Sequence, residues 1–368
     1  MLTHFRKRLR EESRSLVTPG PRMVDEVECI ASVMLAIIFA HWIGARMVAW
    51  AAFTAFVLMR GHVTETLLRG LLRVLGTALG AGLALALVPY AARSLPGSVL
   101  AAAVVGAVGL YGTLTAKRSY AWLLFGLTFE MILLDKIEKP TLDTITFALS
   151  RLLEVVAGTA ACVIVSLLST LTARRRWPGK PAPVTPAIGW HPHAARHAAR
   201  CGVALGLLPV VHALWGIPEL QQAGITIMAV MIVPPAALGG SGLVPVSRRL
   251  AHRMLGCLAG GALAGAIVLL AQGSPPVLIA GTCLGIVIGR HIENGDVRGA
   301  YLGLQFTLAV LVTLVPDSYA DAAIRPALER LTSIFVGMVV LAPFLLAWHL
   351  LARNSAPAGL TGDAPSSE

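Results

Sequence analysis

Long apolar stretches separated by short polar segments dominate the chain. A membrane-spanning helix needs about 20 apolar residues, with a range of about 17–25. Twelve stretches approach this length, and they form one group before residue 172 and another after residue 198. The expected spans are residues 25–44, 46–60, 73–92, 97–116, 119–135, 150–171, 199–217, 222–239, 253–272, 275–290, 299–316 and 329–351. Some spans, notably 46–60, are short, which leaves broken or re-entrant helices open.

The composition is that of an integral membrane protein. The hydrophobic fraction is 56%, the charged fraction is 13% and the mean hydropathy is +0.75, whereas a soluble domain is about a quarter charged. The net charge of +11 does not indicate nucleic acid binding, because aromatic stacking platforms between the basic residues are missing. The five cysteines form no CxxC pair. We therefore expect no metal site, no disulfide and no cofactor.

The positive charges predict the orientation in the lipid bilayer. With the N-terminus in the cytoplasm, about 23 of the Lys and Arg residues fall in cytoplasmic segments and about 7 fall outside, as the positive-inside rule requires. The basic N-terminal segment is not followed by a small-residue cleavage signature, so we expect the first span to be retained. The chain is therefore expected to be multi-pass, with both termini in the cytoplasm.

A phrase in the first half of the chain recurs in the second half. Arg73-x-Leu75-Gly76-x-x-x-Gly80 returns as Arg253-x-Leu255-Gly256-x-x-x-Gly260, 180 positions later. In the same order, Thr54 matches Thr226, Tyr120 matches Tyr301, and Arg151-Leu152 with Gly158 matches Arg330-Leu331 with Gly337. So long a period predicts two duplicated halves rather than a solenoid. Six spans per half is an even number, so the halves point the same way and form a parallel repeat.

The expected fold is therefore all-α, with about twelve transmembrane helices arranged as two parallel six-helix repeats. The first repeat covers residues 25–171 and the second covers 199–351. A basic cytoplasmic segment, 1–24, precedes them, and a Pro- and Arg-rich cytoplasmic linker, 172–198, joins them. The tail, 352–368, is rich in Ala, Pro, Gly and Ser and is expected to be disordered.

The repeated phrase has two interpretations. The two glycines of each phrase lie four residues apart and share one helix face. Small residues at this spacing let membrane helices pack closely, and contact with a substrate is the alternative. Arg73 and Arg253 are expected at the cytoplasmic surface, where they either follow the positive-inside rule or attract an anion to the inner mouth.

A second pair of arginines recurs near the outer surface, where arginine is disfavoured. Glu154 follows Arg151 by three residues, and Glu329 directly precedes Arg330. Either an interfacial ion pair fixes the position of each helix, or the two arginines form an outer anion-binding site on the export path.

Four polar residues within apolar stretches are further candidates for a substrate or proton pathway. Glu130 lies at bilayer depth, where a charge costs about 2.5–3.5 kcal/mol on insertion scales. It is therefore expected to face a cavity and carry a proton, or else to lie near the outer interface. Gln305 could hydrogen-bond a ligand or join two helices. His41 and His212 each lie near a tryptophan, so they either titrate near neutral pH or belong to an aromatic belt.

Several of these residues form a pattern known from one family. Trp50-x-x-x-Thr54, Arg69-x-x-x-Arg73-x-Leu75-Gly76-Thr77-x-x-Gly80 and the Arg151–Gly158 unit are similar to the WxxxT and RxxGTxxG signatures of the fusaric acid resistance family, a branch of the aromatic acid exporter group. The resemblance covers nearly all of residues 25–351. The second half departs from the pattern at Gln222 and Cys257, and the short linker replaces the sizeable cytoplasmic domain of longer members.

The resemblance implies an efflux protein of the bacterial inner membrane. Such proteins export aromatic carboxylates and other toxic organic compounds with proton coupling. They often work with a periplasmic adaptor protein and an outer-membrane channel, and a homo-oligomer is also compatible with the sequence.

The leading functional interpretation is a secondary exporter of organic anions. The sequence holds no GxSxG, HExxH or P-loop motif, so we do not expect an enzyme. A major-facilitator-type carrier also has two parallel six-helix halves, although its GxxxDR element is missing here. A non-transporting scaffold subunit of an envelope complex is the alternative from another class. A transporter should hold a polar cavity between the halves, lined by groups such as Glu130 and Gln305, whereas a scaffold should be packed shut there.

Overall fold

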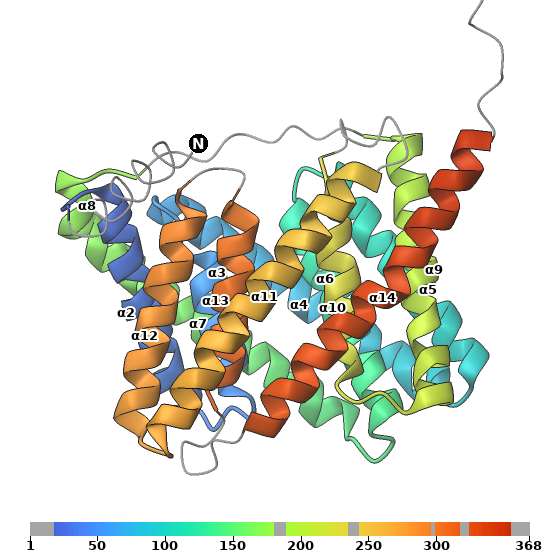
Figure 1. Ribbon diagram of the computed structural model, residues 1–368, viewed down its shortest axis with the longest axis horizontal. Helices are drawn as coiled ribbons and strands as arrows, with labels where there is room; N and C mark the ends of the chain where they lie inside the picture. The colour runs from blue at the N-terminus through green and yellow to red at the C-terminus, as the bar shows by residue number, and fades with distance from the viewer. Residues whose placement is uncertain (1–17, 180–188, 235–242, 296–298, 317–323, 355–368) are drawn as a thin grey trace, which may run out of the picture.

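The computed structural model describes residues 18–179, 189–234, 243–295, 299–316 and 324–354. The regular structure of these described residues is entirely α-helical (Figure 1). The helices are α2 (Pro21–Trp42), α3 (Val48–Leu58), α4 (Val63–Ala91), α5 (Leu95–Thr115), α6 (Ser119–Glu138), α7 (Thr144–Leu171), α8 (Ala173–Arg176), α9 (Pro192–Trp215), α10 (Leu220–Met231), α11 (Leu243–Ala271), α12 (Pro275–Glu293), α13 (Ala300–Leu314) and α14 (Ile324–Asn354). The first part of the predicted N-terminal segment and the centre of the linker lie outside the described residues, as does the predicted tail from residue 355 on, whereas its first three residues belong to α14.

Six of the described helices, α4, α5, α7, α9, α11 and α12, are long and apolar enough to cross a membrane. The chain is thus a multi-pass membrane protein. Helices α3 and α10 have 11 and 12 residues. At 1.5 Å per residue they are about 17–18 Å long, which is well short of the roughly 30 Å hydrocarbon core.

Each of the twelve predicted spans contains a helix, but several helices begin earlier than expected. Helix α4 begins at Val63 and α11 at Leu243, ten residues before the predicted starts. The prediction placed Arg69 and Arg249 outside the helices and Arg73 and Arg253 at their first positions, whereas arginine is a good helix former and the helices run through all four. Helix α9 begins at Pro192, inside the predicted linker, because His191 caps it and proline suits a first helical position.

Helix α7 also begins before its predicted start, at Thr144. The Asp143 side chain caps it by accepting hydrogen bonds from the backbone N–H groups of Ile145, at 3.3 Å, and Thr146, at 3.1 Å. These bonds and one from the Thr146 hydroxyl lower the pKa of the Asp143 carboxyl, which lies outside the span. The added turns place Arg151 well inside the helix rather than at its end.

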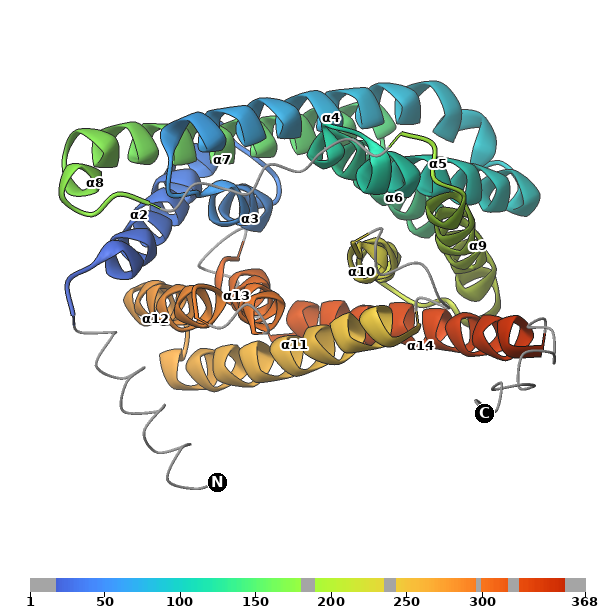
Figure 2. The same cartoon turned by 90° about the horizontal axis from the view of Figure 1, so that it is seen from above.

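The helices form two layers with two short helices between them. Figure 2 shows α4, α5, α6 and α7 in one layer and α11, α12, α13 and α14 in the other. Helices α2 and α9 lie at the two ends of this arrangement, and α3 and α10 lie between the layers. The pairings match between layers: α4 packs on α6 as α11 packs on α13, and α5 packs on α6 as α12 packs on α13.

The repeated glycines lie where two of these pairs touch. A Cβ atom added to Gly76 or Gly80 of α4 would collide with the backbone carbonyls of Ala121 or Phe125 in α6. In the other layer, a Cβ on Gly256 would lie 2.7 Å from the Leu302 carbonyl oxygen, and one on Gly260 would collide with the Phe306 carbonyl. Only glycine lets these backbones approach so closely.

We predict that Gly80→Ala destabilises the protein by about 1–3 kcal/mol, because the added methyl group overpacks the α4–α6 contact. Gly82 is the matched control, since a Cβ there meets nothing within 4 Å. Gly82→Ala should leave stability unchanged or raise it, by roughly 0.5–1 kcal/mol from helix propensity. Thermal unfolding in detergent measures both. Equal shifts for the two variants would show that the α4–α6 contact is not tight.

Candidate functional site

A cavity of about 230 Å³ lies between the two layers. Four helices from the first half of the chain line it, α3, α4, α6 and α7, together with four from the second half, α10, α11, α13 and α14. Its walls are mostly apolar, as in small-molecule sites generally. The polar and aromatic-hydroxyl groups of the lining are Thr54, Arg73, Thr77, Tyr120, Thr128, Arg151, Glu154, Gln222, Arg249, Arg253, Tyr301, Gln305 and Thr313. We call this space the seam cavity.

Arg73 enters the seam cavity from α4. It lies ten residues after the helix begins, which is about 15 Å along the axis, and its residue is 8% exposed. Its Nε donates a hydrogen bond to Thr54 Oγ1 at 3.1 Å, and Nη1 donates to the Tyr120 hydroxyl at 2.8 Å. Thr54 donates its own proton to the Trp50 carbonyl oxygen at 2.8 Å. Its lone pairs are therefore available to the guanidinium group.

Arg253 repeats this arrangement on α11, where it is 4% exposed. Its Nε and Nη2 donate to Thr226 Oγ1 at 3.2 and 3.0 Å, and Nη1 donates to Gln305 Oε1 at 2.5 Å. Thr226 in turn donates to the Gln222 carbonyl oxygen at 2.7 Å. The two sites differ in one acceptor, since a tyrosine hydroxyl serves Arg73 and a glutamine amide serves Arg253.

A second arginine stacks on a tyrosine beside each of these sites. The Arg69 guanidinium carbon lies 4.5 Å from the centre of the Tyr120 ring, and that of Arg249 lies 4.0 Å from the centre of the Tyr301 ring. A cation over an aromatic face gains about 0.5–2 kcal/mol, depending on desolvation. Each half therefore supplies two arginines one helical turn apart, together with a tyrosine and a threonine.

The charge of Arg73 and Arg253 is not balanced within the described part of the chain. Neither has a carboxylate within ion-pair distance, since the ion pairs there involve other arginines. Glu154 is the one carboxylate among the described lining residues, and it pairs with Arg151. The hydrogen bonds that Arg73 and Arg253 donate go to neutral oxygens, and a buried charge without a counter-charge is costly. The seam cavity is thus electropositive and suited to an anion.

Arg151 differs from these two arginines because it carries its own counter-ion. Its Nε lies 3.2 Å from Glu154 Oε2, and both side chains are buried. Glu154 Oε1 also accepts hydrogen bonds from the Met47 backbone N–H at 3.1 Å and the Ser150 hydroxyl at 2.9 Å. The Arg151 guanidinium lies about 5 Å from the Trp50 and Phe147 ring centres. The pair lines the seam cavity and joins α7 to the start of α3. The side chain of Arg330 lies outside the described residues.

Glu130 and Gln305 lie in different places. Gln305 lines the seam cavity and holds Arg253. Glu130 is 1% exposed but is not among the lining residues. It faces the contact between α5 and α9, where its Oε1 would lie 3.1 Å from a Cβ added to Gly106. Neither carboxylate oxygen of Glu130 has a hydrogen-bond partner among the described residues.

The two predicted histidines lie away from the seam cavity. His41 is exposed near the end of α2, and His212 lies near the end of α9 with Nδ1 3.0 Å from the Ile217 carbonyl oxygen. Trp42 and Trp215 nearby are 84% and 69% exposed. This is the placement that an aromatic belt would require.

Several groups that build the site were not among the residues predicted to form it. Thr226, Tyr120 and Tyr301 served only to align the two halves, and Thr54 served for that and for the family signature, yet each touches one of the repeated arginines. The signal for them was present, because polar residues that recur at equivalent positions of two membrane repeats are candidates for the same site.

A family model described as fusaric acid resistance protein-like matches residues 35–165 and 203–344 of the chain. These two segments include every described residue that lines the seam cavity. No curated protein matches the chain.

We predict that Glu154→Gln destabilises the protein by about 3–5 kcal/mol, because it removes one member of a buried ion pair and leaves the other charged. The double variant Arg151→Met, Glu154→Gln should recover much of this loss, since methionine fills the space between the Trp50 and Phe147 rings without a charge. Thermal unfolding midpoints in detergent compare the two. A double variant no more stable than the single one would contradict this account of the pair.

Proposed function

Because the chain belongs to the fusaric acid resistance protein-like family, we propose that it exports organic anions by binding them in the seam cavity, with proton coupling. Membership of this family indicates a membrane transport role of the efflux type. The substrate class, the site and the coupling are inferred from the geometry described above.

One observation carries the proposal: two buried arginines face one cavity without a carboxylate to balance either of them. A carboxylate ligand would supply the missing negative charge. Arg73 suits this role because its Nη2 group has no hydrogen-bond partner among the described residues, while its other two nitrogens are held. Charge-assisted hydrogen bonds from a fixed guanidinium are strong and directional. The apolar walls and the Trp50 and Phe53 rings would contact the body of an organic acid.

The paired geometry supports a parallel repeat of two six-helix halves. Matching helix pairs pack in each half, and Arg73 contacts Thr54 as Arg253 contacts Thr226. Binding sites of repeat transporters lie at the interface of the repeats, and access alternates by motion of one against the other. The seam cavity has this location. The inferred cytoplasmic placement of both termini, in a bacterial inner membrane, rests on the distribution of Lys and Arg.

Glu130 is the proposed proton carrier. A buried carboxylate without a hydrogen-bond partner is far less costly when it is neutral. Its place beside the α5–α9 contact puts the proton outside the seam cavity, so the anion and the proton would occupy separate sites. Protonation of Glu130 would then affect the anion site through the packing of α6, which also carries Tyr120.

Two alternatives are less well supported. A scaffold subunit was expected to be packed shut between the halves, whereas a cavity with charged walls lies there. A major-facilitator-type carrier is disfavoured by the family match. A periplasmic adaptor protein, an outer-membrane channel and a homo-oligomer are compatible with the proposed function.

The decisive experiment uses Arg73→Gln and Arg253→Gln in proteoliposomes. Uptake of a panel of carboxylates should fall at least roughly tenfold in each variant, the loss expected for one charge-assisted hydrogen bond. Uptake of the corresponding methyl esters should not change. Arg118→Gln, at the exposed start of α6 and not among the described lining residues, is the matched control. The ligand-free Arg73→Gln protein should unfold at the same or a higher temperature, since it no longer buries an unbalanced charge. Equal losses for acids and esters would contradict the anion site.

Glu130→Gln should abolish the dependence of carboxylate uptake on an imposed pH gradient, because the amide cannot take up or release a proton. Anion binding in the absence of a gradient should be retained, since Glu130 does not line the seam cavity. Isothermal titration measures binding and the proteoliposome assay measures coupling. A variant that still responds to the pH gradient like the wild type would exclude Glu130 as the carrier.

A further inference from the structure

Besides the α6–α10 contact and several weaker ones, the two halves of the chain meet along two outer helix pairs, α5 with α9 and α2 with α12. These pairs lie at opposite ends of the layered arrangement (Figure 2). In the proposed repeat they are equivalent, because α2 corresponds to α9 and α5 corresponds to α12. Their chemistry is different, and this difference indicates how the halves move.

The α5–α9 pair is held by backbone-close packing. A Cβ added to Gly202 would collide with the Ala103 carbonyl, and one on Gly206 would lie 3.0 Å from the Val99 carbonyl oxygen. Cys201 and Leu205 on the same helix are completely buried in the adjoining core. Apart from the Glu130 carboxylate of α6, which faces this pair, these contacts are apolar, so separating the two helices would open voids between them.

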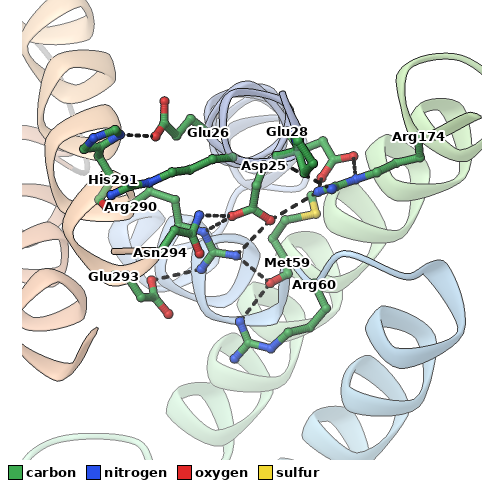
Figure 3. Close-up of polar contacts among 12 residues, drawn as sticks. Asp25, Glu26, Glu28, Met59, Arg60, Arg174, Arg290, His291, Glu293 and Asn294 are labelled. Atoms are coloured by element: carbon green, nitrogen blue, oxygen red, sulfur yellow. Dashed lines mark hydrogen bonds and ion pairs between the residues drawn. The ribbon is translucent and has the colours of Figure 1, made fainter. Parts of the chain in front are cut away.

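The α2–α12 pair is held by charges at one end. Figure 3 shows the side chains of Asp25 and Glu26 from α2 meeting the end of α12, and the side chain of Glu28 meeting Arg174 of α8. Arg290 Nε lies 2.5 Å from Asp25 Oδ2, and Arg290 Nη2 lies 3.2 Å from Asp25 Oδ1. This bidentate ion pair is the main contact between the two helices in this cluster of charged residues.

Further polar contacts surround this ion pair. His291 Nδ1 lies 2.6 Å from Glu26 Oε1, and Asn294 Nδ2 donates to Asp25 Oδ2 at 2.7 Å. Arg174 of α8 binds Glu28 with Nη2 at 2.5 Å. The carboxylates and Arg290 are each less than 9% exposed. Besides this group, Ile286 of α12 packs in the apolar core around α2 and α3.

Arg290 also connects this group to the seam cavity. Its Nη2 donates a hydrogen bond of 3.0 Å to the carbonyl oxygen of Met59, the residue that follows α3. Helix α3 carries Thr54, which holds Arg73, and Trp50, which lines the cavity. A separation of α12 from α2 would therefore release the end of the helix that builds the anion site.

We infer that the α2–α12 pair is a gate which Arg290 closes, and that the α5–α9 pair is the fixed hinge about which the halves turn. The inference rests on the proposed function in one respect, which is the identity of the molecule that passes through the gate. Buried ion pairs suit a gate because their gain and their desolvation cost nearly cancel, so the closed and open states can lie close in energy. Backbone-close apolar packing has no such alternative state, which suits a hinge.

The test measures the two pairs separately by double electron–electron resonance on the full chain, with the five native cysteines replaced by alanine. Spin labels at Val27→Cys and Leu284→Cys report on α2–α12, and labels at Val108→Cys and Val203→Cys report on α5–α9. All four side chains point outward. Arg290→Gln should increase the open α2–α12 population at least tenfold, because it removes one member of a buried pair and leaves the other charged. The α5–α9 distances should not change.

Glu293→Gln is the matched control, because Glu293 binds Arg290 from the same helix at 2.9 Å and does not bridge the pair. It should leave both distances as in the wild type. If Arg290→Gln does not fold, Glu26→Gln, which weakens only the His291 contact, should shift α2–α12 in the same direction. Unchanged α2–α12 distances in the folded variant would overturn the gate, and widening of α5–α9 would overturn the hinge. No substrate is present, so this result is independent of whether Arg73 and Arg253 bind an anion.

Discussion

The structure depends on how two guanidinium groups, those of Arg73 and Arg253, are held inside a membrane protein. Neutral oxygens from threonine, tyrosine and glutamine accept hydrogen bonds from both groups without cancelling their charge. Supplying those oxygens requires a helix between the layers in each half, α3 or α10, and a close neighbour, α6 or α13. The anion site therefore depends both on the short helices α3 and α10 and on the glycine contacts that bring α6 and α13 close.

The buried arginines fall into two classes, which differ in whether a carboxylate balances their charge. Arg151 and Arg290 are each matched by a carboxylate, so they hold helices together and add little net charge to their surroundings. Arg73 and Arg253 are matched by dipoles alone and leave a positive potential in a low-dielectric space. This division separates groups that maintain the closed structure from groups that are available to a ligand.

The sequence predicted the positions of the helices because apolar stretches of sufficient length have few alternatives in a membrane. It did not predict where α4 and α11 begin, since it took the arginines as markers of the helix ends. Nor could it show that Arg73 meets Tyr120, 47 positions away, because hydropathy gives the depth of a residue but not its neighbours. Glu130 illustrates the same limit. A position at bilayer depth was predicted for it from the sequence, but the face that it occupies depends on how α6 packs against α5.

The glycine contacts of α4 with α6 have a consequence for the precision of the site. Gly76 and Gly80 fix the separation of two helices that carry the two members of one hydrogen bond, Arg73 as the donor and Tyr120 as the acceptor. Whatever motion the halves undergo, helices in backbone contact move as one body. The guanidinium group is thus preorganised before any ligand arrives, and little conformational entropy is left to be lost on binding.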